Sequence, residues 1–319
     1  MRFAKGHGTG NDFVILVDSG DDQGLSPGLA ARLCDRRAGL GADGVLRAVR
    51  TGALGREGMR ADGPGGARDG AAEAGGEPGR TASGGRAAGM ANGSAPGPQP
   101  APFPEWFMDY RNSDGSTAEM CGNGIRVFAR YLADRGLATG PTFTVATRSG
   151  FRRVRLEDDG NITAEMGGVT VLGPGSAVVG DRSCEGLRIS VGNPHLACLV
   201  GTPLAGFDLT RPPRLDRAQF PQGGNVELVR VTRPGVAEMR VHERGSGETA
   251  SCGTGAVAAA AAAAAAAGRD HGSWQVSVPG GRLTVTLERG AGWLSGPAVI
   301  VAEGELNDAW LAAATAGSR

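Results

Sequence analysis

The chain has 319 residues, with 33 basic and 33 acidic side chains and a formal net charge of zero. This length suffices for one large or two ordinary domains, and the balanced charge argues against a protein that binds nucleic acid or a membrane surface. We therefore expect a small-molecule partner, with no nucleic acid and no membrane.

The N-terminal segment and the cysteines indicate the compartment. Residues 1–7 lack the apolar stretch of a secretory signal peptide, so we expect the mature chain to begin here and to remain in the cytoplasm. The five cysteines are an odd set without close Cys pairs or Cys/His ligand spacing. This pattern is typical of free thiols in a reducing compartment, and we expect neither disulfides nor a metal site.

The first hundred residues divide into a structured part and an insertion. Residues 2–5 and 13–17 predict strands, residues 6–12 predict a glycine-rich turn between them, and residues 27–36 predict a helix. Residues 51–102 are rich in Gly, Ala, Arg, Pro and Ser and contain no aromatic residue, Ile or Val. Such a segment buries too little apolar surface to offset the entropy lost on ordering, so we expect a disordered insertion that acts as a spacer.

After the insertion, short strands and helices follow one another. Helices are predicted at about 124–135, near 215–218 and at 254–267. Strands are predicted at 106–110, 143–145, 152–156, 162–166, 187–191, 227–231, 237–241, 275–278, 283–287 and 298–302. The alanine run of the last predicted helix is shorter than the roughly 20 apolar residues that span a bilayer. We expect this helix to pack closely inside a curved sheet.

Two similar turns each place a cysteine directly before a predicted helix: Cys121-Gly122-Asn123-Gly124 and Cys252-Gly253-Thr254-Gly255. Backbone N–H groups are free at the start of a helix, at the positive end of its dipole, and they favour a thiolate and a bound anion. A single cysteine in this position is more often a small buried residue, but the duplication favours chemistry. The two turns predict two thiols on opposite sides of one anionic substrate, as in a two-base racemase or epimerase.

The lysine content excludes two common kinds of chemistry. Lys5 is the only lysine, and it lies near the start of a predicted strand. Pyridoxal phosphate enzymes need a Schiff-base lysine, and a P-loop needs its Gly-Lys-Ser/Thr sequence. The glycines of residues 6–10 resemble a phosphate loop only in their spacing, because no acidic partner or βαβ unit follows. We therefore expect no cofactor.

Epimerisation of an amino acid without a cofactor makes specific demands on a protein. Removal of the α-proton builds negative charge on the adjacent carboxylate, and the loss of one preorganised donor to such charge typically costs ~3 kcal/mol. The N–H groups of Gly122, Asn123, Gly253 and Thr254 are the predicted donors. Inversion also needs a base on one face and an acid on the other, which Cys121 and Cys252 can provide as a coupled pair.

Six stretches of the chain together resemble the diaminopimelate epimerase family. They are residues 5–13, 110–116, 120–126, 192–195, 224–227 and 242–255. The resemblance extends over nearly the whole chain outside the 51–102 insertion. It implies an α+β fold of two pseudo-symmetric lobes, each a curved β-sheet or barrel wrapped around a central helix, with the active site in the cleft between them. The implied N-terminal lobe is 1–165, completed by 288–319, and the C-terminal lobe is 166–287.

The resemblance also implies roles for individual residues. Cys121 is the implied acid and Cys252 the implied base in the LL-to-meso direction, and His195 and Glu243 help to set the protonation of the thiols. Arg244 offers a planar fork for a distal carboxylate, while Glu243 can also hold an ammonium group. The surrounding amide groups are those of Asn11, Asn112, Asn193 and Asn225.

Two further positions bear on this resemblance. Many family members carry Gln where this chain has Gly44, so any substrate contact from that side chain is lost and Gly44 is left out of the site. Trp293 occupies the place of an aromatic residue through which family members commonly pair, so we expect a homodimer with an exposed Trp293 at its interface.

The implied reaction is the interconversion of LL- and meso-2,6-diaminopimelate, which serves lysine and peptidoglycan precursor synthesis. One alternative is a proline or hydroxyproline epimerase of the same fold, although that enzyme needs no reader of a distal carboxylate such as Arg244. The other is a non-catalytic binding protein on this scaffold, which needs no second thiol.

Overall fold

The structure is a computed structural model that describes residues 1–22, 24–54 and 103–316. The described residues up to 54 and from 104 onward belong to one compact unit. The predicted disordered insertion lies, apart from residues 51–54, outside the described residues. Its two attachment points are adjacent, because the N–H of Thr51 donates to the carbonyl of Glu105 over 2.9 Å.

The described residues of the first half form seven strands around one long helix. The elements are β1 (Arg2–Gly8), β2 (Asn11–Val17), α1 (Pro27–Cys34), β3 (Gly44–Arg50), β4 (Trp106–Asn112), α2 (Gly122–Asp134), β5 (Thr142–Thr147), β6 (Gly150–Leu156) and β7 (Ile162–Gly168).

The second half repeats this arrangement and ends with an additional strand and helix. The elements are β8 (Thr170–Val179), β9 (Arg182–Ser190), β10 (Pro194–Leu199), a 3-10 turn (Leu204–Gly206), β11 (Arg214–Leu215), β12 (Asn225–Arg233), β13 (Val236–Glu243), β14 (Gly247–Thr249), α3 (Gly253–Ala266), β15 (Gly272–Val278), β16 (Gly281–Glu288), β17 (Ala291–Gly296), β18 (Val299–Glu305) and α4 (Asp308–Ala316).

The strand pairings show the internal duplication directly. In the first half, β1 is antiparallel to β2, β2 is parallel to β3, β3 is antiparallel to β4, and β4 is parallel to β5 across α2. In the second half, β9 is antiparallel to β10, β10 is parallel to β12, β12 is antiparallel to β13, and β13 is parallel to β15 across α3. The strands that follow each helix, β5–β6–β7 and β15–β16–β17, are antiparallel. Each lobe is therefore the same unit of strands built around one helix.

The C-terminal part of the chain ties the two lobes together. Strand β18 pairs with β1, as β8 pairs with β9 in the second lobe, and β17 pairs with β7 of the first lobe. Helix α4 packs on α1. The predicted lobe boundaries at residues 165 and 288 stay a prediction, because these pairings cross between the halves.

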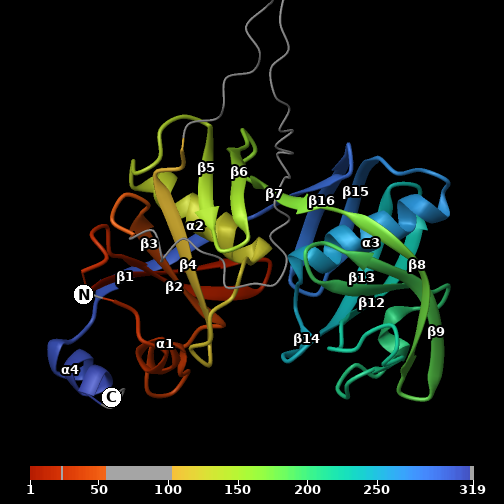
Figure 1. The fold of residues 1–319 in the computed structure, drawn as a ribbon, viewed down its shortest axis with the longest axis horizontal. Coiled ribbons are helices and arrows are strands. Elements are labelled where there is room, and N and C mark those ends of the chain that lie inside the picture. The colour runs from red at the N-terminus through yellow and green to blue at the C-terminus, as the bar shows by residue number, and fades with distance from the viewer. Residues whose placement is uncertain (23, 55–102, 317–319) are drawn as a thin grey trace, which may run out of the picture. The chain divides into compact units, whose positions relative to one another are not determined.

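Helices α2 and α3 each lie among the strands of their own half (Figure 1). Each of them contributes to a separate hydrophobic core. Helix α2 buries large side chains such as Ile125, Phe128 and Leu132. Helix α3 instead buries the continuous stretch Gly255–Ala264 on all sides, so strands approach it closely. Gly292 of β17 illustrates the distance, because a Cβ there would lie 2.6 Å from a methyl group of Val257. The predicted close packing of the alanine helix inside a sheet is confirmed.

Two local predictions are wrong. No helix forms at 215–218, because Arg214–Leu215 pairs with β8 as a strand. The Asp216 side chain then accepts the N–H of Ala218 in a turn. The glycine-rich turn is also shorter than predicted, because β1 continues to Gly8.

The sequence patterns missed several strands, among them β3, β8, β10 and β17, and the helix α4. The α+β class with two similar lobes is confirmed. Among the described residues, no helix is long and apolar enough to cross a membrane.

Candidate active site

Cys121 and Cys252 occupy the same position at the starts of the two central helices. Both are N-cap residues in extended conformation, with φ of −136° for Cys121 and −122° for Cys252. The Sγ of Cys121 accepts the N–H of Gly124 over 3.3 Å, and the Sγ of Cys252 accepts the N–H of Gly255 over 3.4 Å. Each sulfur thus takes the place of the oxygen of a capping side chain, at the positive end of a helix dipole.

The two cysteine turns touch each other through glycine. A Cβ placed on Gly122 would lie 3.1 Å from the Cα of Gly253, and one placed on Gly253 would lie 3.0 Å from the Cα of Gly122. The Nδ2 of Asn123 donates to the carbonyl of Ser251 over 3.2 Å, which links the first turn to the residue before Cys252. The structure therefore brings the two predicted thiol turns together, and the helices supply no acceptors for the N–H groups of their first turns.

The surroundings raise the pKa of both thiols above its usual value. Burial raises the pKa of Cys121; the N–H groups of Gly124 and Asn123 and the charge of Arg126 lower it, and the charge of Glu243 raises it. Burial also raises the pKa of Cys252. The negative charges of Glu243 and Glu227 raise it further, so that it lies well above its usual value. The two thiols are thus electrostatically unequal.

Glu243 lies where it acts on both thiols. It is the last residue of β13, and its Oε1 accepts a hydrogen bond from the hydroxyl of Thr249. Burial raises the pKa of the Glu243 carboxyl, while hydrogen bonds from Thr249 and Cys252 lower it. A carboxylate in contact with one thiol and in the field of the other can hold or receive a proton there.

His195 is fully buried between two partners. Its Nδ1 lies 2.7 Å from the Oε1 of Glu227, and its Nε2 lies 2.9 Å from the Oδ1 of Asn193. Glu227 is also fully buried, and its second oxygen has no hydrogen-bond partner among the described residues. The sequence analysis missed Glu227. The available signal was a carboxylate at the first position of the predicted strand 227–231, whose other residues are mainly apolar.

The four predicted asparagine side chains each form a hydrogen bond to a different neighbour. Asn193 lies beside the second turn, and its Nδ2 donates to the hydroxyl of Thr254 over 3.4 Å. Asn225 accepts the backbone N–H of Arg244 over 2.9 Å and so fixes the chain after Glu243. Asn11 accepts a hydrogen bond from Asn123, whereas Asn112 donates to Ser116 over 3.0 Å.

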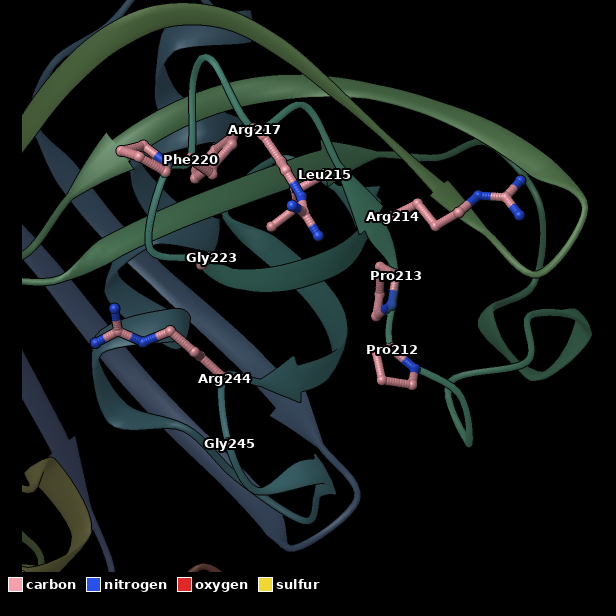
Figure 2. A pocket seen from close by; sticks show the side chains of 11 residues that line it. Pro212, Pro213, Arg214, Leu215, Arg217, Phe220, Gly223, Arg244 and Gly245 are labelled. Carbon is pink, nitrogen blue, oxygen red and sulfur yellow. The ribbon is translucent and has the colours of Figure 1, made fainter.

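Arg244 lines a pocket of about 750 Å³ that contains neither cysteine. Its side chain is exposed, and its Nη1 donates to the carbonyl of Gln222 over 3.3 Å. Figure 2 shows Arg244 on one side of this pocket, Arg217 pointing inward from another loop, and Arg214 pointing away from Arg244. The pocket lining contains no acidic residue, so it suits an anionic group. The other residues of the lining are Pro212, Pro213, Leu215, Phe220, Pro221, Gly223, Gly224 and Gly245.

Gly44 has a steric role that the sequence did not indicate. It opens β3 opposite Asn112, and a Cβ there would lie 2.6 Å from both the carbonyl of Arg111 and the ring of Tyr110. Burial raises the pKa of Tyr110 well above its usual value, and the charges of Cys121 and Glu243 act in the same direction. Tyr110 is therefore a neighbour of the site that sequence reasoning missed.

Two remaining predictions concern Trp293 and Lys5. The expectation of an exposed Trp293 is wrong: its strand is paired on both sides, the residue is partly buried, and the guanidinium of Arg153 lies 4.9 Å from its ring centre. The Nζ of Lys5 forms a 2.7 Å ion pair with Asp12 and also donates to the carbonyl of Gly41. Among the described residues, no cluster of three His, Cys, Asp or Glu could hold a metal ion.

Comparison with known proteins identifies relatives over almost the full length. The family model for diaminopimelate epimerase matches residues 99–172 and 187–307. A diaminopimelate epimerase of Thermobifida fusca is 55% identical over 96% of this chain and 98% of its own length. One of Mycolicibacterium smegmatis is 45% identical over 97% of this chain and 98% of its own. A solved PhzF-family phenazine biosynthesis protein from Bacillus anthracis shares the fold, with a TM-score of 0.62 at 15% identity, over 96% of this chain and 99% of its own.

Proposed function

Because the chain belongs to the diaminopimelate epimerase family, we propose that it is the isomerase that interconverts LL- and meso-2,6-diaminopimelate for lysine and peptidoglycan precursor synthesis. The observation that carries the proposal is the contact of the two cysteine turns at Gly122 and Gly253, which brings two thiol-capped helix starts to one place. A single substrate carbon between them has a proton carrier on each face.

The proposed chemistry uses only the two thiols and the substrate. One thiolate takes the α-proton, so an S–H bond forms, the C–H bond breaks, and its electron pair spreads into the α-carboxylate. The opposite thiol then gives its proton to the other face of the carbon and becomes the thiolate. At the end of the reaction the two sulfurs have exchanged their roles as thiolate and thiol, and nothing has been oxidised or reduced. By family resemblance, Cys252 is the base and Cys121 the acid in the LL-to-meso direction.

The helix starts stabilise the intermediate. Charge that develops on the α-carboxylate meets the first-turn N–H groups of α2 and α3, including those of Gly122, Gly253 and Thr254. These donors are fixed before the reaction, which is the condition under which such stabilisation is large. His195 and Glu243 are proposed to adjust the protonation of Cys252, with Glu227 holding His195 in one orientation.

The distal end of the substrate requires its own recognition. Arg244 is the proposed partner of the distal carboxylate, because it lines a pocket without acidic side chains and its guanidinium can bind a carboxylate. Asn225 supports it by holding the Arg244 backbone. The nearby Glu243 has a carboxylate that can accept the distal ammonium group.

We also propose that the reaction needs no pyridoxal phosphate. Lys5 is the only lysine in the chain, and its ammonium group is paired with Asp12. The free state of all five cysteines supports a cytoplasmic location.

A homodimer is proposed on family resemblance. The proposal is supported by the exposed apolar residues Val299 and Val301 on β18, a strand that among the described residues pairs with β1. Sedimentation of wild type, Val301→Lys and Trp293→Ala tests it, and a wild-type monomer would exclude it.

The decisive experiment follows proton exchange in heavy water with pure protein, LL-diaminopimelate and no added cofactor. We expect the meso product to carry deuterium at the inverted centre while recovered substrate initially keeps its proton, since different thiols serve the two faces. Proline and hydroxyproline serve as control substrates and should not exchange. Equal early labelling of substrate and product would exclude the two-base scheme, and absence of turnover would exclude the reaction.

A further inference from the structure

Arg126 is a buried arginine whose charge no residue of the proposed mechanism neutralises. It follows Cys121 by five positions on α2, its side chain is fully buried, and it has no ion-pair partner among the described residues. Its Nε is also without a hydrogen-bond acceptor in this part of the chain. Val257 holds the equivalent position after Cys252, so the charge distinguishes the first turn from the second.

The guanidinium of Arg126 forms three hydrogen bonds around the first cysteine turn. Nη1 donates to the carbonyl of Gly122 over 2.9 Å, at the point where the two turns touch. Nη2 donates to the Oδ1 of Asn123 over 2.8 Å and to the hydroxyl of Thr9 over 3.0 Å. The planar fork therefore fixes the first helical residues and the tip of the β1–β2 hairpin at once.

The same network continues into the second turn. The Ser251 hydroxyl donates to the hydroxyl of Thr9 over 3.1 Å, and Asn123 donates to the Ser251 carbonyl. Thr9 has a φ of 48°, a left-handed conformation that a β-branched residue rarely adopts. Such a conformation persists where its surroundings fix it, and such sites are often functional. Thr9, Arg126, Asn123 and Ser251 form a connection between the two thiol turns, which we call the interturn network.

The charge of Arg126 acts on the first thiol and on whatever anion lies between the turns. The groups that face Cys121 are Glu243 from β13, Tyr110 from β4 and Arg126 from its own helix. Arg126 is the cation among them, and burial lowers its own pKa to about 10, so it stays charged at neutral pH. A buried cation without a carboxylate is stabilised when negative charge arrives beside it.

We propose that Arg126 is a positioning residue that holds the two thiol turns in register through the interturn network, and that its charge favours the thiolate at Cys121 over that at Cys252. The proposal rests on the two-thiol function for its consequence in turnover, but not for its effect on the thiol itself. The substrate's α-carboxylate benefits from the same charge, because it binds at the same pair of helix starts.

Two substitutions at Arg126 separate the effect of its planar guanidinium from the effect of its positive charge. Arg126→Lys keeps a cation and loses the planar fork, whereas Arg126→Gln keeps one polar group and loses the charge. Arg130→Gln is the matched control, because Arg130 lies one turn further on the same helix, where it donates to the carbonyl of Gly160. The measurements are kcat and KM for epimerisation, and the pH midpoint of Cys121 alkylation by iodoacetamide, read peptide by peptide in the full-length protein.

The expected results differ for the two variants. Both should lose at least about tenfold in kcat, because small displacements of reacting groups have large effects on rate. The midpoint for Cys121 should rise by at least about half a pH unit in Arg126→Gln and stay near that of wild type in Arg126→Lys. Arg130→Gln should match wild type in both measurements. An unchanged kcat and midpoint in Arg126→Gln would overturn the proposal, and equal midpoint shifts in both variants would overturn the role of the charge.

Thr9→Gly tests the network without touching the arginine, and glycine tolerates the backbone conformation at this position. It should lower kcat while leaving the Cys121 midpoint unchanged, and a folded Thr9→Gly protein with wild-type kcat would overturn the positioning role. The alkylation measurement needs no turnover. A wild-type protein that is inactive on diaminopimelate would therefore exclude the proposed function while the Cys121 midpoints still decide the effect of Arg126.

Discussion

Gly122 and Gly253 are in backbone contact, so close that a methyl group on either would lie about 3 Å from the Cα of the other. Each is the first residue of its helix and directly follows a cysteine. The absence of two side chains is therefore what allows the two thiols to share one site. Neither glycine has a positive φ, so space rather than backbone conformation requires glycine here.

Gly122→Ala and Gly253→Ala should each separate the two turns. We expect kcat to fall by about tenfold or more in each variant, because the reacting groups lose their alignment. Gly201→Ala is the control, since nothing lies within 4 Å of a Cβ at that position. Steady-state kinetics together with thermal unfolding check this, and wild-type kcat in both glycine variants would show that the contact has no role in the reaction.

Cys121→Ala and Cys252→Ala should each abolish epimerisation, because each thiol serves one face of the substrate. The loss should reach about 10²–10⁴-fold, the usual contribution of a general acid or base. Cys184→Ala, in a separate core cluster, is the control and should keep its activity. The assay is diaminopimelate turnover on variants with an unchanged circular dichroism spectrum. Wild-type turnover by either Cys121→Ala or Cys252→Ala would contradict the two-base scheme.

The pH dependence should respond to Glu243. The negative charge of Glu243 raises the pKa of both thiols, so its removal in Glu243→Gln lowers both. A profile of kcat/KM that rises as one thiol ionises and falls as the other loses its proton should move to lower pH on both limbs. Glu238→Gln, on the same strand but facing Arg230, is the control. A shift to higher pH is the outcome incompatible with this assignment.

Glu227 should stabilise the folded protein through its hydrogen bond with His195. Removing one partner of a buried pair leaves the other unsatisfied, so Glu227→Ala should lower the free energy of unfolding by about 3–5 kcal/mol. Glu227→Gln keeps an oxygen for the His195 ring and should cost clearly less. Urea unfolding at pH 7 measures both values. Equal losses would mean that the hydrogen bond to His195 contributes nothing.

Arg244 should act on substrate affinity through the distal carboxylate. Arg244→Ala should lower kcat/KM by roughly 10–100-fold, as expected for the loss of a charge-assisted hydrogen bond. Arg244→Lys should recover only part of this, because an ammonium group lacks the planar fork. Arg214→Ala is the control, because Arg214 lines the same pocket but points away from Arg244 (Figure 2). Equal effects at the two arginines would exclude a specific carboxylate partner.

The sequence by itself determined the chemistry-bearing parts of this protein. The duplicated Cys-Gly-x-Gly turns, each before an apolar helix, predicted two equivalent thiol sites, because capping and helix periodicity are local properties. The alanine content of α3 predicted a helix enclosed by strands for the same reason. Local patterns failed where neighbours decide: Arg214–Leu215 is a strand because β8 lies beside it, and β3 was missed because its partners β2 and β4 are distant in the sequence.

Only the tertiary structure decided how the two sites become one. The contact of Gly122 with Gly253, the burial of Glu227 against His195 and the convergence of Thr9, Arg126 and Ser251 join residues from separate parts of the chain. The first and the last depend on strands that pair across the two halves, such as β7 with β17 and β1 with β18, whereas Glu227 meets His195 because β10 pairs with β12. Strand pairing over such separations leaves no local pattern, so the sequence can supply the residues of this site while the fold supplies their distances.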